Sequence, residues 1–193
     1  MTSTTSADFP PYSYVPGHFP HPISNPAGHS FGLSVHKPEP IDPENWQAST
    51  EYLRGIELFE HGYYWEAHEV WESLWHAAGR TGPIADFLKA LIKLAATGVK
   101  VREGNAAGVT AHARRAGELL RRVSEALLDQ QTAGKSWLGF DLTKLIEFAD
   151  EAIHVRPIAS DGEMPPVAVV NWCGSMKSCL SMFDPALARF LLP

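Results

Sequence analysis

The uneven distribution of proline limits where this chain can form helices. Eight of the fifteen prolines lie in residues 1–40, together with four histidines and several glycines. Because proline removes a backbone donor and fixes φ, neither a helical nor a strand period of useful length can develop there. We therefore predict that residues 1–40 form an extended, irregular arm, and we expect helices in the segment that follows.

Residues 41–156 carry the signals of consecutive helices. Apolar residues recur at spacings of three and four, most regularly from Val109 to Leu127, which indicates helices packed on other helices. Asp42, which is followed by proline, is a predicted helix start, and Gly104 is a predicted left-handed helix end. The expected helices cover residues 42–61, 63–78, 83–104, 105 to about 127, and 141–156.

These signals predict an all-α fold, a compact bundle of about five helices with an irregular Pro-rich N-terminal arm. Residues 157–193 are predicted to form an irregular C-terminal tail that packs on the bundle, with residues 167–170 extended against the core and a last turn starting at Asp184. The predicted organisation is thus an arm over residues 1–40, a bundle domain over 41–156 and a tail over 157–193.

Composition and charge exclude several classes of partner. The formal charge is −6, and residues 39–75 hold nine acidic residues against the single base Arg54, so a phosphate backbone would be repelled there. No apolar run reaches the roughly 20 residues of a membrane span, and the N-terminus lacks the pattern of a secretory signal. Cys173 and Cys179 are too few for a disulfide framework. We expect a cytoplasmic protein with reduced thiols that binds neither nucleic acid nor membrane.

The predicted helix over residues 63–78 contains the best candidate site. An advance of about 100° per residue turns one apolar stripe toward the core. A different sector collects an imidazole and a carboxylate between two indole rings, namely Trp65, His68, Glu72 and Trp75. Glu69 lies beside this sector, and Glu66 is expected to face solvent near the helix N-terminus, where negative charge is favourable.

This sector has the chemistry of a metal site. A histidine and a carboxylate one helical turn apart can bind the same divalent metal ion, because their side chains project from one face roughly 6 Å apart. His68 and Glu72 are the predicted metal ligands, and Glu69 is a candidate third ligand. Trp65 and Trp75 are predicted to form the walls of the site.

Further donors for the metal have to come from outside this helix. The candidates are His61 and, more weakly, the arm histidines His18, His21 and His29. Residues 68–72 start like the His-Glu-x-x-His zinc motif, but Glu72 stands where that motif has its second His. With Glu72 in place of a histidine, the site has more oxygen ligands and fewer nitrogen ligands, so iron and manganese are candidate metals beside zinc.

The motif also gives a family resemblance. His68, Glu72 and Trp75 fit the pattern His-x-x-x-Glu followed by two residues and Trp or Tyr, and residues 62–72 and the small-residue helix after Gly104 agree with it. On these residues the chain resembles the bacterial and archaeal domain of unknown function 309, over roughly residues 50–130. The resemblance implies a compact helical fold and metal binding at the His-and-Glu motif, and it implies no established reaction.

Three interpretations of the site stay open. The first is a metal site, which can serve a metal-assisted enzyme. The second is a hydrogen-bonded pair of His68 and Glu72 that fixes helix packing in a non-catalytic interaction or scaffold module. The third is metal-free acid–base chemistry by His68, oriented by Glu72. The sequence identifies neither a small-molecule nor a protein partner, and a homo-oligomer stays open.

A stripe of charged side chains on the predicted helix over residues 83–104 is the remaining candidate. It consists of Asp86, Lys89, Lys93, Thr97 and Lys100. The stripe could bind an anionic substrate, but any exposed helix face has this composition. We interpret it as a solvated face.

Overall fold

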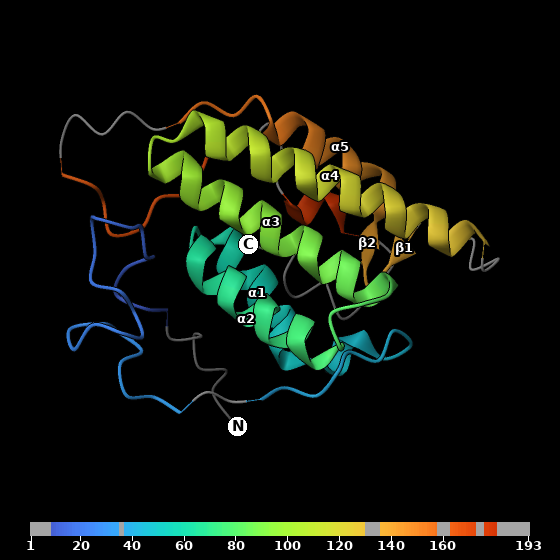
Figure 1. The fold of residues 1–193 in the computed structure, drawn as a ribbon, viewed down its shortest axis with the longest axis horizontal. Helices are drawn as coiled ribbons and strands as arrows, with labels where there is room; N and C mark the ends of the chain where they lie inside the picture. The colour runs from blue at the N-terminus through green and yellow to red at the C-terminus, as the bar shows by residue number, and fades with distance from the viewer. Residues whose placement is uncertain (1–8, 35–36, 130–135, 158–162, 173–175, 181–193) are drawn as a thin grey trace, which may run out of the picture.

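A computed structural model gives the fold of the chain (Figure 1). It describes residues 9–34, 37–129, 136–157, 163–172 and 176–180. Within these residues the elements are the helices α1 (Thr50–Glu60), α2 (Tyr64–Ala77), α3 (Pro83–Arg102), α4 (Ala106–Asp129) and α5 (Leu142–Ala152), the 3-10 turns η1 (Trp46–Ala48) and η2 (Met176–Cys179), and the strands β1 (Ser136–Trp137) and β2 (Phe140–Asp141). The predicted all-α bundle is confirmed.

Helices α2, α3 and α4 lie side by side in one layer, with α3 in the middle (Figure 1). Helix α1 packs on α2 and α5 packs on α4. Phe59 of α1 meets Phe148 of α5 with ring centroids 6.4 Å apart, so these two helices close the core from the same side. The aromatic side chains Tyr64 and Trp71 of α2 are completely buried in that core. None of the described helices is long and apolar enough to cross a membrane.

Local signals in the sequence set several helix ends. Pro83 occupies the start of α3, where a missing N–H costs no helical hydrogen bond. The Asn105 side chain accepts a hydrogen bond from the N–H of Gly108 at 2.8 Å at the start of α4. The Asp141 carboxylate accepts from two N–H groups at the start of α5. The predicted starts of these three helices are therefore confirmed.

One predicted helix start is wrong, because α1 begins at Thr50 and not at Asp42. The Asp42 carboxylate accepts a hydrogen bond from the N–H of Glu44 at 3.0 Å, which closes a local turn that competes with a helix. Ser49 caps α1 instead, accepting from the N–H of Tyr52 at 3.3 Å. The short turn η1 between the two places Trp46 in the core.

A small hairpin follows α4, in the stretch between the last two predicted helices, for which no element was predicted. Strands β1 and β2 pair antiparallel through a turn at Leu138 and Gly139, whose φ angles of 47° and 82° are left-handed. The Tyr52 hydroxyl donates to the carbonyl oxygen of Leu138 at 2.8 Å, which fixes the turn against α1. Phe140 forms an isolated bridge with Leu180, so the end of the described chain is held on the bundle.

The arm and the tail are irregular, and their described parts are packed on the bundle. Val15 of the arm is completely buried, and the N–H of Ser13 donates to the carbonyl oxygen of Pro166 at 2.9 Å. In the predicted extended run over residues 167–170, Val170 is buried whereas Val169 is 61% exposed. The predicted turn at Asp184, and Cys173, lie outside the described residues.

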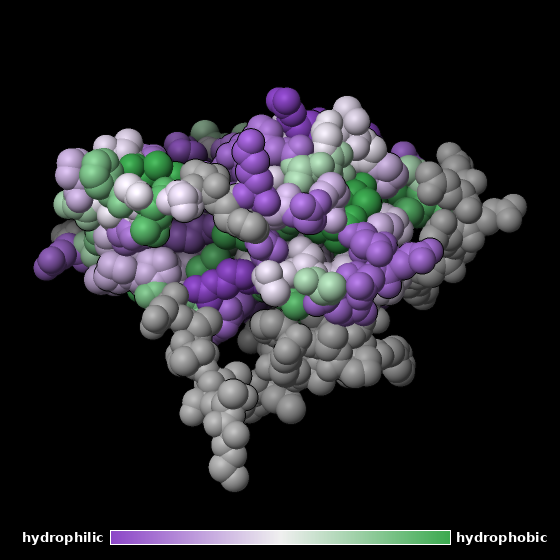
Figure 2. Space-filling view, turned by 90° about the horizontal axis from the view of Figure 1, so that it is seen from below, coloured by the Kyte–Doolittle hydropathy of each residue, from purple (hydrophilic) through white to green (hydrophobic). Residues whose placement is uncertain are grey.

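The arm also carries apolar side chains on its outer surface. Its exposed large hydrophobic residues are Ile23, Phe31 and Leu33, which are 44%, 49% and 69% exposed. Figure 2 shows apolar residues at the end of the molecule that the arm occupies, beside a surface on which hydrophilic residues predominate.

Candidate metal centre

The structure brings three of the predicted ligands together on α2. One ligand atom from each of His68, Glu69 and Glu72 lies within 4.8 Å of the others, the only such group of three found among the described residues. His68 and Glu72 meet because side chains four apart on a helix project from one face. Glu69 joins them through its Oε1, which lies 3.3 Å from His68 Nδ1. All three side chains are partly exposed, so the group is open to solvent.

One nitrogen of the His68 ring lacks the hydrogen bond that a buried polar atom normally makes. Its Nδ1 atom is buried, yet it makes no hydrogen bond of acceptable geometry, even to Glu69. Among the described residues there is also no hydrogen bond between the His68 and Glu72 side chains, so the alternative of a hydrogen-bonded pair lacks its defining contact. A buried nitrogen without a partner is uncommon in folded proteins and calls for a ligand or water.

The two predicted walls differ in their surroundings. Trp75 lies beside cations, with Lys89 Nζ 4.7 Å and the Arg80 guanidinium 6.0 Å from its ring. Its indole Nε1 is buried and finds no hydrogen-bond partner among the residues that the structure describes. Trp65 instead contacts the arm, with edge-on ring contacts at 5.4 Å to both Tyr14 and His21. The arm therefore reaches α2 next to the His68 group.

The arm histidines lie outside the group of three donors. His29 Nε2 is 3.1 Å from Glu66 Oε1, and both side chains are only 7% exposed. His21 Nδ1 accepts from two backbone N–H groups of its own turn, and His18 is exposed. His61 is exposed, with its Nδ1 2.8 Å from the carbonyl oxygen of Glu57. None of these four histidines contributes a donor atom to the group formed by His68 and its neighbours.

The expectation that Glu66 faces solvent is wrong. Glu66 is 6% exposed because the arm covers it, and its Oε1 accepts hydrogen bonds from His29 and from the N–H of Tyr14 at 3.0 Å. Its Oε2 is buried and has no hydrogen-bond partner in the described part of the chain. No local signal in the sequence marks this burial, because the groups that contact Glu66 lie 37 and 52 residues away in the chain.

A buried arginine joins the arm and the tail near Glu66. Arg102, at the end of α3, is 2% exposed and donates to the carbonyl oxygens of Ser13 at 3.1 Å and Pro165 at 2.7 Å. Burial lowers the pKa of the Arg102 guanidinium, and the charges of Glu66 and Tyr64 partly oppose that shift. The guanidinium therefore serves to fasten two irregular segments to the bundle.

The interpretation of the lysine stripe on α3 as a solvated face is wrong for one of its residues, Thr97. Thr97, which was expected on that face, is completely buried and donates to the carbonyl oxygen of Lys93 at 2.8 Å. His112 of α4 lies near the same stripe and was missed in the sequence. Burial lowers the pKa of His112, and the charges of Lys93, Lys100 and His68 lower it further. No local pattern marks His112, because these neighbours lie on other helices.

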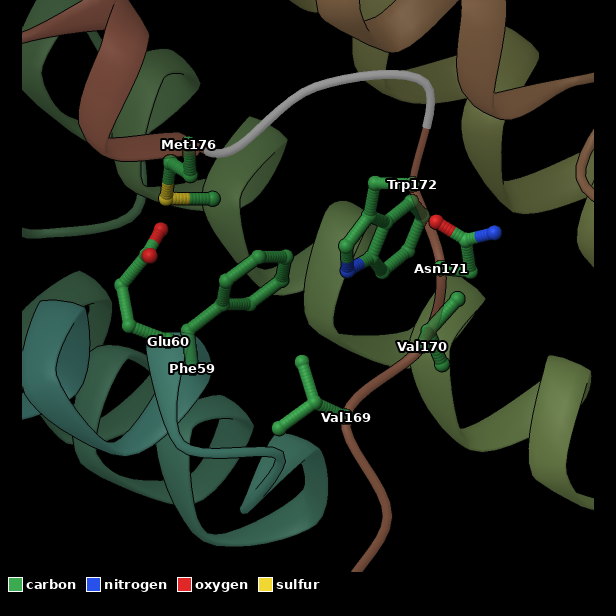
Figure 3. Close-up of a pocket in the computed structure, with 7 residues that line it drawn as sticks. All are labelled: Phe59, Glu60, Val169, Val170, Asn171, Trp172 and Met176. Carbon is green, nitrogen blue, oxygen red and sulfur yellow. The ribbon is translucent and has the colours of Figure 1, made fainter.

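A separate pocket lies between α1 and the tail (Figure 3). It has a volume of about 250 Å³ and is lined by Phe59, Glu60, Val169, Val170, Asn171, Trp172 and Met176. Phe59 and Trp172 stack with centroids 5.5 Å apart, and the Trp172 indole N–H donates to the Tyr64 hydroxyl at 3.3 Å. This pocket shares no residue with the His68 group.

Comparison with known proteins places the candidate centre inside a conserved domain model. Residues 52–111 match the model of the domain of unknown function DUF309, a segment that contains the His68 group and ends one residue before His112. No curated protein and no solved structure matches the chain. The resemblance inferred from the sequence is thus confirmed over residues 52–111, the segment that matches the DUF309 model.

Proposed function

We propose that the protein binds a divalent metal ion through His68, Glu69 and Glu72. The observation that carries this proposal is the convergence of one donor atom from each side chain within 4.8 Å. The buried His68 Nδ1 without a hydrogen bond supports it, because a bound cation would supply the partner that this nitrogen lacks.

The donor set favours particular ions and leaves room for chemistry. One imidazole nitrogen with two carboxylates suits zinc, iron(II) or manganese(II). Three protein ligands leave at least one coordination position for water or a substrate, as in catalytic metal sites. A metal ion supplies a water of lowered pKa at such a position, which supports metal-assisted hydrolysis as the reaction class.

Metal analysis of protein purified without chelator tests the proposal. We expect near-stoichiometric metal in the wild-type chain and its loss in His68→Ala and Glu72→Gln. His76→Ala is the matched control, because His76 is an exposed histidine on the same helix outside the group. Wild-type protein that holds no metal above the buffer level, and takes up none of the three ions on reloading, would refute the proposal.

The rival function, a scaffold module with His68 as a structural residue, predicts a different result. Removing a structural hydrogen-bond partner should lower the free energy of unfolding of metal-free protein by about 1–3 kcal/mol. Under the metal proposal His68→Ala changes the stability of metal-free protein little, since His68 Nδ1 makes no hydrogen bond in the structure. Urea unfolding with and without chelator therefore separates the two functions.

A further inference from the structure

Lys93 is a cation of α3 for which the described part of the chain provides no partner. Among the described residues its ammonium makes neither an ion pair nor a hydrogen bond. The neighbouring lysines of the stripe are occupied, since Lys89 lies over the Trp75 ring and Lys100 pairs with Glu103 at 2.5 Å. A partly exposed ammonium without a carboxylate is available to an external anion.

Two contacts fix how α2 and α3 run past each other. Lys89 Nζ lies 4.7 Å from the Trp75 ring at one end. At the other end Gly98 lies directly against the Tyr64 ring, where an added Cβ would be 2.5 Å from the ring. Increasing residue numbers on α3 therefore meet decreasing numbers on α2, and the helices are antiparallel.

This register places Lys93 beside the candidate metal centre. Lys93 is one turn beyond Lys89 on α3, and Glu72 is about one turn before Trp75 on α2. Because the helices are antiparallel, both steps lead in the same direction along the helix pair. Lys93 thus lies at the level of Glu72, on the side of the layer where Lys89 meets Trp75.

The register of α3 with α4 is fixed by two further contacts. An added Cβ on Gly108 would lie 2.8 Å from the Lys100 side chain, and Arg122 pairs with Asp86 at 3.3 Å. Lys100 and Asp86 are separated by as many residues as Gly108 and Arg122. The antiparallel register of α3 and α4 is therefore constant between these two contacts.

His112 and His68 therefore approach α3 at the same level from opposite sides. Ala96 precedes Lys100 by four residues on α3, and His112 follows Gly108 by four residues on α4, so Ala96 and His112 are at the same level. Ala96 is also two turns beyond Lys89 on α3, and His68 is two turns before Trp75 on α2, so Ala96 and His68 are at the same level as well. Ala96, a small residue, is at this level on the middle helix α3, and Figure 1 shows the three helices side by side. The electrostatic effect of His68 on His112 agrees with this placement.

We infer that Lys93 and His112 form an anion subsite beside the His68 group, and that its ligand is the phosphate group of a substrate bound to the metal ion. The inference rests on the proposed function for the metal, but the placement of Lys93 and His112 does not depend on a bound metal ion. Glu69 and Glu72 together balance the charge of a divalent ion. Lys93 adds one positive charge, and His112 adds a second when an anion favours its protonation, so a dianion fits better than a carboxylate.

Titration of the full chain with inorganic phosphate tests the subsite. The readout is the NMR signal of the His112 ring, followed in metal-free and in metal-loaded protein. We expect a saturable shift in both, with tighter binding when metal is present. Lys93→Gln should weaken phosphate binding about tenfold or more, which is the usual effect of losing one hydrogen bond to a charged group. Lys144→Gln, an exposed lysine on α5, is the control and should bind as the wild type does.

The outcomes separate the subsite from the metal. If phosphate shifts His112 in a Lys93-dependent way while the protein takes up no metal, the proposed function fails and the subsite stands. No saturable shift of His112, or equal affinity in Lys93→Gln and wild type, overturns the subsite whatever the metal content. Acetate is the comparison ligand, and binding as tight as that of phosphate would refute the assignment to a dianion.

Discussion

The buried carboxylate of Glu66 allows a quantitative test of how the arm is held. In Glu66→Ala, the N–H of Tyr14 and the Nε2 of His29 both lose their acceptor, and the side chains of His29 and Glu66 are each only 7% exposed. Each orphaned buried partner costs about 1–3 kcal/mol, so the two together cost about 2–6 kcal/mol. The substitution also removes the unpaired Oε2, which returns about 1–3 kcal/mol. We expect a net loss of about 1–3 kcal/mol in the free energy of unfolding.

Urea unfolding and amide hydrogen exchange measure this effect. The free energy of unfolding should fall, and the N–H of Tyr14 should exchange faster than in the wild type. Glu66→Gln keeps an acceptor at the same place and should recover most of the loss. Glu118→Ala breaks an exposed ion pair with Arg115 and should change stability by less than about 0.5 kcal/mol. Glu66→Ala with wild-type stability and unchanged exchange at Tyr14 would show that the contacts do not hold the arm.

Two further predictions concern the packing and ionisation of Tyr64. Gly98→Ala places a Cβ 2.5 Å from the buried Tyr64 ring and should cost about 1–3 kcal/mol, seen as a lower Tm. Gly117→Ala places a Cβ 2.9 Å from Arg121 Nη1 and 3.1 Å from Asp150 Oδ1, the ends of two exposed side chains that can shift, and should be neutral or stabilising. Burial raises the pKa of Tyr64 to about 12 from its ordinary 10.0, so the unfolded chain ionises first and the contribution of Tyr64 to stability, unchanged below pH 10, should fall by about 2–3 kcal/mol toward pH 12, in addition to the loss from Tyr52, whose pKa burial also raises. Tyr64→Phe should flatten this alkaline loss in pH-dependent urea unfolding, and an equally steep loss in the variant would assign the effect to another group.

The local parts of the fold could be predicted from residues close together in the chain. Pro83, Asn105 and Asp141 mark helix starts because the groups they serve lie within the next turn. The same reasoning failed at Asp42, whose carboxylate closes a turn with Glu44 rather than capping a helix. A carboxylate that caps a helix and one that closes a turn both accept from backbone N–H groups just after them in the chain. The turn also buries Trp46, and the spacing of apolar residues does not reveal this tertiary contact.

The candidate centre likewise has features that follow from local sequence and features that depend on tertiary packing. The pairing of His68 with Glu72 follows from helical geometry alone, since residues one turn apart share a face in any α-helix. The burial of Glu66 and the approach of His112 depend on segments far away in the sequence, which only helix packing and the arm bring close. The sequence by itself therefore determined the helices and the His68 group. Only the tertiary structure decided which charged side chains are buried, because burial is set by what packs over a residue and not by its neighbours in the chain.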